Sequence, residues 1–515
     1  MWKYIADRES GTLRPNSFAS RFKSTRVASI DLSNHKEFVS PHKGAINSLQ
    51  VDLAEGRYLL SGAADASVAV FDVQGATDHE GGGLIARHKS IFTVDKQHES
   101  GHQYAISSAI WYPIDTGLFI TGSYDHLINV WDTNTTQVVM NFNMPGKVYK
   151  TAMSPLANSH MLLAAGTEDV QVRLCDISSG AFTHMLSGHR DGVMSIEWSM
   201  SSEWVLMTGG CDGAIRFWDI RRAGSFQVLD QSQSQLGRRP PVLRRCVSEK
   251  GLSSKSSPSS HTANARPVKS KSISKQSTNR NRCQTTGARK QRLHPGLLST
   301  QDHATAHYGA VTGLKVTEDG MYLLSAALWL NVLVSTAPLK KDAPTAKFQS
   351  GKAEVVIFCN KQCIHLIVCI GVYVLIKPTE AALVFAGSDS RLRLWDIESG
   401  WNTLVNYETA RLQGTKPTQL AVTQDSSLVY VPCMNSVKAF DFWSGRTFKT
   451  FRGHYESVNC CCFNFHDQEL YTGGNDRQIL VWSPPSFTSD NLMDMQAEGG
   501  GRRRYPLQDQ DNWSD

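Results

Sequence analysis

The stretch WVLMTGGCDGAIRFWD, residues 204–219, contains two apolar segments separated by a turn with Gly and Asp, and it ends on an aromatic-Asp pair. Apolar residues that alternate at a period of two are typical of β-strands with one buried face. We therefore predict two antiparallel strands joined by the turn at Asp212. Variants of this unit recur along the chain as YLLSGAADASVAVFD (58–72), LFITGSYDHLINVWD (118–132), MLLAAGTEDVQVRLCD (161–176), SDSRLRLWD (388–396), LVYVPCMNSVKAFD (428–441) and LYTGGNDRQILVW (470–482).

An Asp, a His and a Thr recur with these units. The turn Asp is present in six of them, as Asp65, Asp125, Asp169, Asp212, Asp389 and Asp476. A His precedes four units, as His42, His189, His307 and His454, and a Thr stands four residues before the Asp in three, as Thr121, Thr208 and Thr472. Buried polar groups need hydrogen-bond partners, so these side chains are predicted to bind one another and to fix the geometry of each repeat.

The expected networks are His189, Thr208 and Asp212 in one unit, and His454, Thr472, Asp476 and Trp482 in another. Such a trio also resembles the Ser-His-Asp set of hydrolases. Catalysis needs only one copy of that set, whereas this one recurs, so the structural interpretation is favoured. We find no motif for a cofactor, and we expect neither a cofactor nor a metal.

These units resemble WD repeats, and the resemblance covers residues 25–482 apart from two insertions. It implies an all-β fold, a seven-bladed WD-repeat β-propeller. The stretch Arg26–Val39 is expected to supply the outer strand of the last blade, which closes the ring and removes exposed sheet edges. The remaining segment, 483–515, is predicted to be a disordered tail.

The first insertion, residues 223–300, holds 15 Lys/Arg against two acidic residues and has almost no aromatic residues. Such a composition cannot bury enough apolar surface to offset the entropy of ordering, so a disordered basic loop is predicted. Its basic pairs are consistent with a nuclear-import signal, with a weak nucleic-acid arm or with a solvated tether. These three alternatives remain open, and direct contact with nucleic acid is therefore uncertain.

The second insertion, residues 327–386, interrupts the fifth blade. Without it the sequence would read YLLSAGSDSRLRLWD, and Ser325 would stand four residues before Asp389, as Thr208 stands before Asp212. We interpret this anomalous insertion as translated non-coding sequence, such as a retained intron. If it is present, either Ala381–Phe385 replaces the strand YLLSA, or the blade pairs correctly and expels the insert. Its residues Cys359, Cys363, His365 and Cys369 have a spacing that fits no structural zinc module well.

Two general features limit the class of protein and the cellular compartment that the sequence suggests. Met1–Ser24 has no apolar core of the kind a signal peptide needs, and no uninterrupted apolar run is long enough to span a bilayer. The 11 Cys show no even framework of spacings. Both features favour a reducing cytosolic or nuclear compartment and argue against a membrane protein.

The sequence Trp218-Asp219-Ile220-Arg221 fits the W-D-x-R box of WD proteins that dock onto a cullin-RING adaptor, the large subunit of the damage-specific DNA-binding protein. An Arg suits this contact because its planar fork pairs with carboxylates and carbonyls across an interface. The alternative is that Arg221 is an exposed loop residue.

A wider set of turn and loop strings resembles the Cockayne syndrome A family: EGRYLLSG (55–62), WYPIDTG (111–117), VWDTNT (130–135), NTLVNY (402–407), GHYESVNCC (453–461) and QELYTGGNDRQILVW (468–482). The resemblance implies a non-catalytic nuclear protein, the substrate-recognition subunit of a cullin-RING E3 ubiquitin ligase in transcription-coupled nucleotide excision repair. The implied partners are the adaptor, the cullin-RING ligase, a Cockayne syndrome B-type ATPase and stalled RNA polymerase II. Residues 1–24 resemble the short helical extension that such receptors insert into the adaptor. The alternative is a WD-repeat scaffold for signalling or chromatin complexes with no ligase link.

Overall fold

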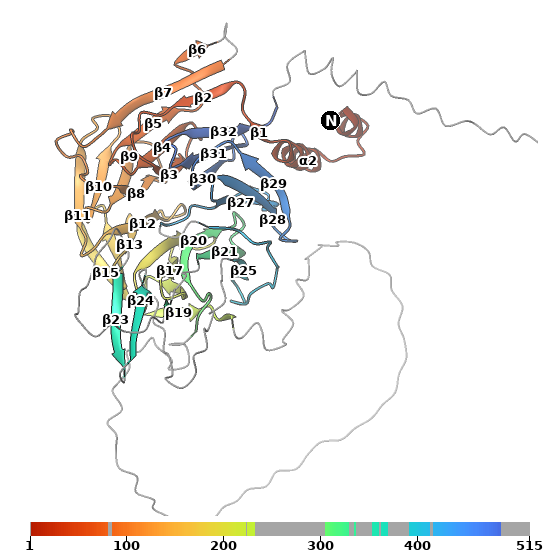
Figure 1. Cartoon of the computed structure of the whole chain (residues 1–515). Helices are drawn as coiled ribbons and strands as arrows, with labels where there is room; N and C mark the ends of the chain where they lie inside the picture. Colours follow the sequence, from red (N-terminus) through yellow and green to blue (C-terminus); the bar gives the residue numbers. More distant parts are fainter. Residues whose placement is uncertain are drawn as a thin grey trace, which may run out of the picture.

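Seven antiparallel sheets follow one another around a central axis in the computed structural model (Figure 1). The structure describes residues 2–80, 85–222, 224–231, 304–328, 334–335, 353–359, 362–368, 391–412 and 416–485. The predicted seven-bladed propeller is confirmed. The predicted basic loop, 223–300, begins too early, because Ser225–Val228 forms the outer strand of blade four and pairs with the strand before it. Residues 232–300 of that loop and 486–515 of the predicted tail lie outside the described residues, as does Asp389.

Each blade is a meander that runs from the central axis outward, and the strand bounds are as follows. Blade one holds β3 (Ile46–Val51), β4 (Tyr58–Ala63), β5 (Val68–Asp72) and β7 (Ile85–Val94), blade two β8 (Ile106–Trp111), β9 (Leu118–Ser123), β10 (Leu127–Asp132) and β11 (Val138–Asn143), and blade three β12 (Val148–Met153), β13 (Leu162–Thr167), β14 (Gln171–Asp176) and β15 (Ala181–Ser187). Blade four holds β16 (Val193–Trp198), β17 (Val205–Gly210), β18 (Ile215–Asp219) and β19 (Ser225–Val228), and blade five β20 (Ala310–Val316), β21 (Tyr322–Leu328) and β25 (Leu392–Asp396). Blade six holds β26 (Ala421–Val422), β27 (Leu428–Cys433), β28 (Ser436–Asp441) and β29 (Thr447–Arg452), and blade seven β30 (Val458–Asn464), β31 (Glu469–Gly474) and β32 (Ile479–Ser483).

The ring closes between blades seven and one, where β30 packs against β3. The two-residue strand β1 (Asp31–Leu32) pairs with β32 and completes blade seven, as predicted. The rest of the stretch Arg26–Val39 departs from the prediction, because β2 (Lys36–Val39) pairs in parallel with β7 of blade one. The reason is the length of β7. Its first half extends past the residues that pair with β5, and β2 and β6 (Asp78–Glu80) pair with this first half.

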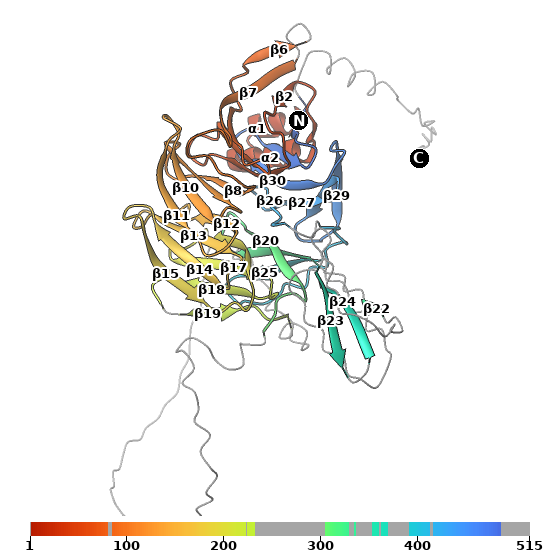
Figure 2. The same ribbon diagram turned by 60° about the vertical axis from the view of Figure 1, so that its left-hand side comes forward.

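Two helices precede the ring, α1 (Trp2–Glu9) and α2 (Pro15–Ala28). The predicted helical extension is thus present, and α2 continues past residue 24 to Ala28. Figures 1 and 2 both show α2 beside the seventh blade, and Val27 at its end is buried in the core between blades six and seven. Helix α2 begins at Pro15, because the fixed φ of proline suits the first position of a helix.

Blade five is intact despite its insertion. Strand β21 pairs with β25 so that Ser325 faces Arg393 and Leu323 faces Trp395, which is the register of the uninterrupted repeats. YLLSA is therefore the native strand, and the replacement by Ala381–Phe385 is wrong. Part of the insertion forms a separate sheet from β22 (Val334–Ser335), β23 (Ala353–Cys359) and β24 (Gln362–Val368).

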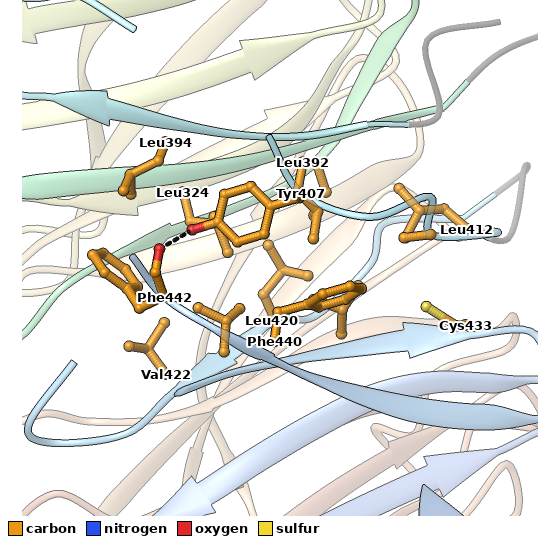
Figure 3. Packing of buried hydrophobic residues seen from close by; sticks show 14 of the residues in the cluster. Leu324, Leu392, Leu394, Tyr407, Leu412, Leu420, Val422, Cys433, Phe440 and Phe442 are labelled. Carbon is orange, nitrogen blue, oxygen red and sulfur yellow. Dashed lines mark hydrogen bonds between the residues drawn. The ribbon is translucent and has the colours of Figure 1, made fainter. Parts of the chain in front are cut away.

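A packed apolar cluster joins blade five to blade six (Figure 3). Leu324 and Leu394 of blade five meet Leu420 and Phe440 of blade six, and all four are buried. The Tyr407 hydroxyl, from the segment between the blades, donates a hydrogen bond of 2.7 Å to the carbonyl of Phe442. The cluster shows that the interrupted blade packs against its neighbour as the other blades do.

Candidate functional site

The predicted polar network is present in blade four, where His189, Thr208 and Trp218 are buried and the Asp212 side chain is 8% exposed. Thr208 Oγ1 lies 2.7 Å from His189 Nε2, and Trp218 Nε1 donates to the same oxygen at 2.8 Å. His189 Nδ1 lies 3.1 Å from Asp212 Oδ1. Burial would raise the pKa of Asp212, but the hydrogen bond from His189 and two backbone N–H groups hold it below its usual value. The Thr hydroxyl can donate to the His while it accepts from the Trp, so no polar atom of the set lacks a partner.

The same arrangement recurs in blade seven. His454 Nε2 lies 2.9 Å from Thr472 Oγ1, Trp482 Nε1 donates to that oxygen at 2.9 Å, and His454 Nδ1 lies 2.7 Å from Asp476 Oδ2. In blade five Ser325 takes the Thr position, 2.7 Å from His307 Nε2. The recurrence fits a structural role better than a catalytic one.

Sequence reasoning missed the blade-two histidine. His102 Nδ1 lies 2.8 Å from Asp125 Oδ2, and its Nε2 lies 2.7 Å from Thr121 Oγ1. The signal was the dipeptide Gly101-His102, which precedes Asp125 by the spacing that separates His189 from Asp212. Blade one uses a variant, in which Ser67 stands between the ring of His42 and the carboxylate of Asp65. There burial lowers the pKa of His42 to about 4, although the charge of Asp65 acts in the opposite direction.

The Trp-Asp-Arg corner, residues 218–221, lies where the third strand of blade four turns into the fourth. Trp218 is fully buried, and Asp219 follows it as the last residue of β18. Arg221 donates to both carboxylate oxygens of Asp219, from Nε at 2.9 Å and from Nη2 at 2.9 Å, and its guanidinium lies 5.2 Å from the centre of the Trp204 ring. The hydrogen bond from Arg221 lowers the pKa of Asp219.

Arg221 lies in an exposed turn, as the alternative interpretation expects, but its guanidinium has partners within the chain. Its side chain is 54% exposed, but Asp219 and Trp204 hold the guanidinium in one orientation. A surface Arg that is already ordered loses less conformational entropy when it binds a partner. The next residue, Arg222, is 74% exposed and approaches Asp219 only at 3.6 Å.

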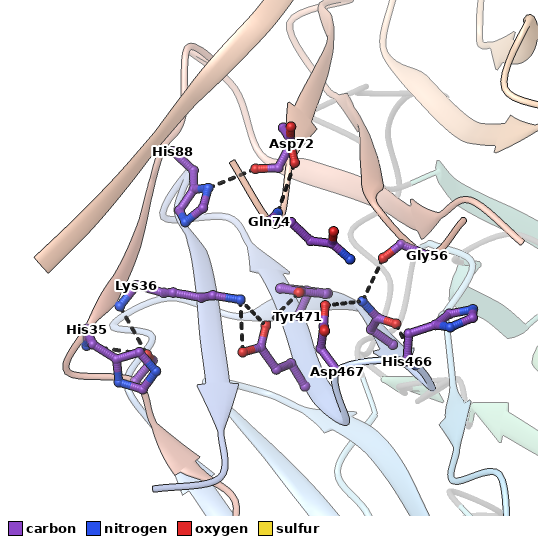
Figure 4. A network of polar contacts seen from close by, with 12 residues as sticks. His35, Lys36, Gly56, Asp72, Gln74, His88, His466, Asp467 and Tyr471 are labelled. Atoms are coloured by element: carbon purple, nitrogen blue, oxygen red, sulfur yellow. Dashed lines mark hydrogen bonds and ion pairs between the residues drawn. The ribbon is translucent and has the colours of Figure 1, made fainter. Parts of the chain in front are cut away.

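Blade one has an equivalent corner that the sequence did not reveal. Arg57 donates to Asp72 Oδ2 from Nε at 3.1 Å and from Nη2 at 2.7 Å, and this contact lowers the pKa of Asp72 to about 2 against the effect of burial. Figure 4 shows Asp72 beside the closure of the ring, where its carbonyl accepts a hydrogen bond from His88 Nδ1. Lys36 pairs with a buried glutamate, Glu469, that also accepts a hydrogen bond from the Tyr471 hydroxyl. Figure 4 labels Lys36 and Tyr471 in this network.

The helices and the Trp-Asp-Arg corner lie on one face of the ring. In a four-strand meander, the loop after the first strand and the loop after the third leave the sheet at the same end. Arg221 follows the third strand of its blade. Lys23 and Ser24 of α2 contact Gln424 and Asp425 at 3.2 and 3.0 Å, and both partners lie in the loop after the first strand of blade six. One partner surface could therefore cover both features.

The described part of the chain contains neither a cluster of metal ligands nor a membrane-spanning helix. Within these ranges no group of three or more His, Cys, Asp or Glu side chains is arranged to hold a metal ion. None of the helices that the structure describes is both long and apolar enough to span a bilayer. The side chains of Cys359, Cys363, His365 and Cys369 are outside what the structure describes.

Among known proteins, the chain matches a plant WD-repeat protein over its whole length. The family model described as "WD domain, G-beta repeat" matches residues 93–132, 180–219 and 445–483. WD repeat-containing protein ATCSA-1 of Arabidopsis thaliana is 59% identical over 519 residues, which covers 100% of both chains. Radiation-sensitive protein 28 of Saccharomyces cerevisiae is 29% identical over 128 residues, 24% of this chain and 25% of that protein. Histone acetyltransferase type B subunit 2 of Candida glabrata is 26% identical over 174 residues, 34% of this chain and 38% of that protein.

Proposed function

Because the chain belongs to the Cockayne syndrome A family of WD-repeat proteins, we propose that it is the substrate receptor of a cullin-RING E3 ubiquitin ligase in transcription-coupled nucleotide excision repair. The observation that carries the proposal is the placement of α2 and the ordered Arg221 on one face of the ring. An adaptor that binds a helical extension and an Arg-bearing corner would find both on this face. The partner proposed for it is the large subunit of the damage-specific DNA-binding protein.

In this proposal the protein acts by proximity and supplies no reacting group. The adaptor holds the face that carries α2 and Arg221, and the opposite face is left for substrate. Holding a substrate lysine near a ubiquitin-charged enzyme raises its effective concentration there. A Cockayne syndrome B-type ATPase and stalled RNA polymerase II are the proposed partners at the repair site, and the nucleus is the proposed location.

Affinity purification of the full chain from nuclear extract tests this proposal. We expect the adaptor and a cullin to co-purify in stoichiometric amounts with the full chain, and to be reduced with a variant that lacks residues 1–24. Recovery of chromatin or signalling proteins without adaptor or cullin would instead support the scaffold function.

Arg221→Ala is expected to weaken adaptor binding about tenfold or more, the loss typical of a hot-spot arginine. The reason is that the ordered guanidinium presents its remaining donors at the proposed interface. Arg222→Ala is the matched control, because Arg222 is adjacent and more exposed but makes only a 3.6 Å contact with Asp219. A binding titration with purified adaptor measures both variants, and equal affinities for Arg221→Ala and wild type would contradict the assignment.

Removing residues 238–292 is expected to reduce nuclear accumulation of a fluorescent fusion while the propeller stays folded. The basic pairs in this segment and its lack of core residues motivate the prediction. Imaging gives the nuclear-to-cytoplasmic ratio, and a melting curve of the purified variant checks the fold. If the truncated protein accumulated in the nucleus as wild type does, import would depend on another segment or on a partner.

A further inference from the structure

The Arg57–Asp72 pair of blade one repeats the construction of the Arg221–Asp219 pair of blade four. In each blade the carboxylate belongs to the last residue of the third strand, and the Arg donates to it from both Nε and Nη2. The two arginines reach this position from different loops. Arg57 precedes the second strand of its blade, whereas Arg221 follows the third strand, so no common sequence motif marks both corners.

Both guanidinium groups are ordered, and both keep donors that the chain does not use. Arg57 lies 5.4 Å from the centre of the Tyr58 ring, and Arg221 lies 5.2 Å from the centre of the Trp204 ring. The two arginine side chains are 42% and 54% exposed. In each of them the Nη1 group has no hydrogen-bond partner in the part of the chain that the structure describes, so it can donate to a second molecule.

The loop that carries Arg57 holds its shape through other contacts. The carboxylate of Asp52 accepts hydrogen bonds from the backbone N–H groups of residues 55–58, at distances between 2.6 and 3.0 Å. Gly56 has a φ of +66°, and a Cβ atom there would collide with the ring of His466 from blade seven, a contact that Figure 4 shows. The loop therefore does not depend on the side chain of Arg57.

The carboxylate of Asp72 does not depend on Arg57 either. Its Oδ1 accepts hydrogen bonds from the backbone N–H groups of Gln74 at 2.9 Å and Gly75 at 2.8 Å. Ion pairs between exposed side chains contribute little to folding stability. The fold of blade one thus gives little reason for an ordered, exposed Arg at this position, whereas an interface does, because such a side chain loses less conformational entropy on binding.

The two arginines lie on the same face of the ring, on opposite sides of its central channel. Arg57 is in the loop after the first strand of blade one, and Arg221 follows the third strand of blade four, so both lie on the face that carries α2. Blades one and four are three positions apart, the largest separation in a ring of seven. The channel has a cavity volume of about 390 Å³ and is lined by Asp52 and Leu53 of the blade-one loop and by Met200 of the blade-four loop. A partner that contacts both arginines must extend across the mouth of this channel.

We propose that Arg57 is a second docking residue for the adaptor, so that blades one and four hold it from both sides of the channel. The inference rests on the proposed function, because it adds a contact to the same interface. The free donors at each corner suit carboxylate or carbonyl oxygens of the partner. Two contacts on opposite sides of the ring also fix the rotation of the partner over this face, which one corner cannot do.

A binding titration of the full chain with purified adaptor tests the role of Arg57. Arg57→Ala is expected to bind about tenfold more weakly than wild type, with an unchanged melting temperature. Arg57→Lys should recover only part of this loss, because lysine keeps the charge but not the planar fork. The matched control is Arg87→Ala, which should bind as wild type does. Arg87 is also a partly exposed arginine of blade one, paired with Glu37 at 3.0 Å, but it lies on the outer strand β7.

The double variant Arg57→Ala/Arg221→Ala tests whether both corners contact one partner at the same time. Substitutions at distant sites have additive effects on the binding free energy, so the double variant should bind about a hundredfold more weakly than wild type. A double variant that binds no more weakly than Arg221→Ala alone would overturn the inference.

Equal adaptor affinities for wild type and Arg57→Ala would also overturn it and would leave the proposed function in place. A loss in Arg57→Ala that Arg87→Ala matches, or that comes with a lower melting temperature, would assign Arg57 to the fold of blade one and reject it as a docking residue. If the wild-type chain did not bind the adaptor, the proposed function would fail, and the second docking residue with it.

Discussion

Thr472→Val is expected to lower the free energy of unfolding by about 3 kcal/mol. The substitution keeps the volume of the side chain but removes the hydroxyl that His454 Nε2 and Trp482 Nε1 share. Both nitrogens are then buried without a partner, and each such loss costs about 1–3 kcal/mol. Chemical denaturation of the purified chain, followed by Trp fluorescence, measures the change.

Two further variants separate the hydroxyl from the methyl group. Thr472→Ser should recover most of the stability, since Ser325 and Ser61 hold the same position in blades five and one and bind His307 and His42. Thr93→Val on the exposed outer strand of blade one should have little effect, because Thr93 contacts only the Ser90 hydroxyl there. A loss in Thr472→Val no larger than in Thr93→Val would show that the network does not hold the blade.

Local spacing made this network predictable. A Thr that stands four residues before the turn Asp takes the same buried position in each blade that has one. Thr208 and Thr472 could therefore be assigned from the sequence alone. His102 follows the same rule, because it precedes Asp125 by the spacing that separates His189 from Asp212. The pairing of Arg57 with Asp72 could not be found in this way, because it depends on the strand pairing that brings these residues together.

The ends of the propeller were less predictable for a similar reason. The two-residue strand β1 joins blade seven because that blade lacks an outer strand, which the repeat count indicates. The parallel pairing of β2 with β7 depends on how far β7 extends past its neighbour, and no repeat pattern encodes that length.

The deletion of residues 327–386 is expected to raise both the soluble yield and the melting temperature. The blade already pairs as if the insertion were absent: Ser325 lies 2.7 Å from His307, and Trp395 Nε1 donates to Ser325 at 2.9 Å. The insert therefore adds length to a turn without changing the strands that flank it. Closing a connection of about 65 residues in place of one of about five costs about 2 kcal/mol in chain entropy.

The structure also defines how this deletion should join. Ala327 pairs with Val311 as Ala63 pairs with Ile46 in blade one, and Leu328 pairs with Ala310, so β21 continues two residues past the predicted boundary. Deleting 328–387 keeps Ala327 in that position, and deleting 327–386 places Gly387 there. Both variants should melt a few degrees above the full chain. Their agreement would show that the gain comes from the shorter turn and not from one junction residue.

The apolar run Ile364–Ile376 gives a second reason to expect higher yield. An uncharged segment of this length with high β-propensity is an aggregation hazard whenever it is exposed, during folding or afterwards. Size-exclusion chromatography of the full chain and both deletions measures the soluble monomer directly. Transcript sequencing tests the retained-intron hypothesis separately, and the dominant messenger should lack codons 327–386. If the full-length form proved abundant, soluble and as stable as the deletions, the insertion would be a genuine element of the protein, and its sheet of β22, β23 and β24 would need a role of its own.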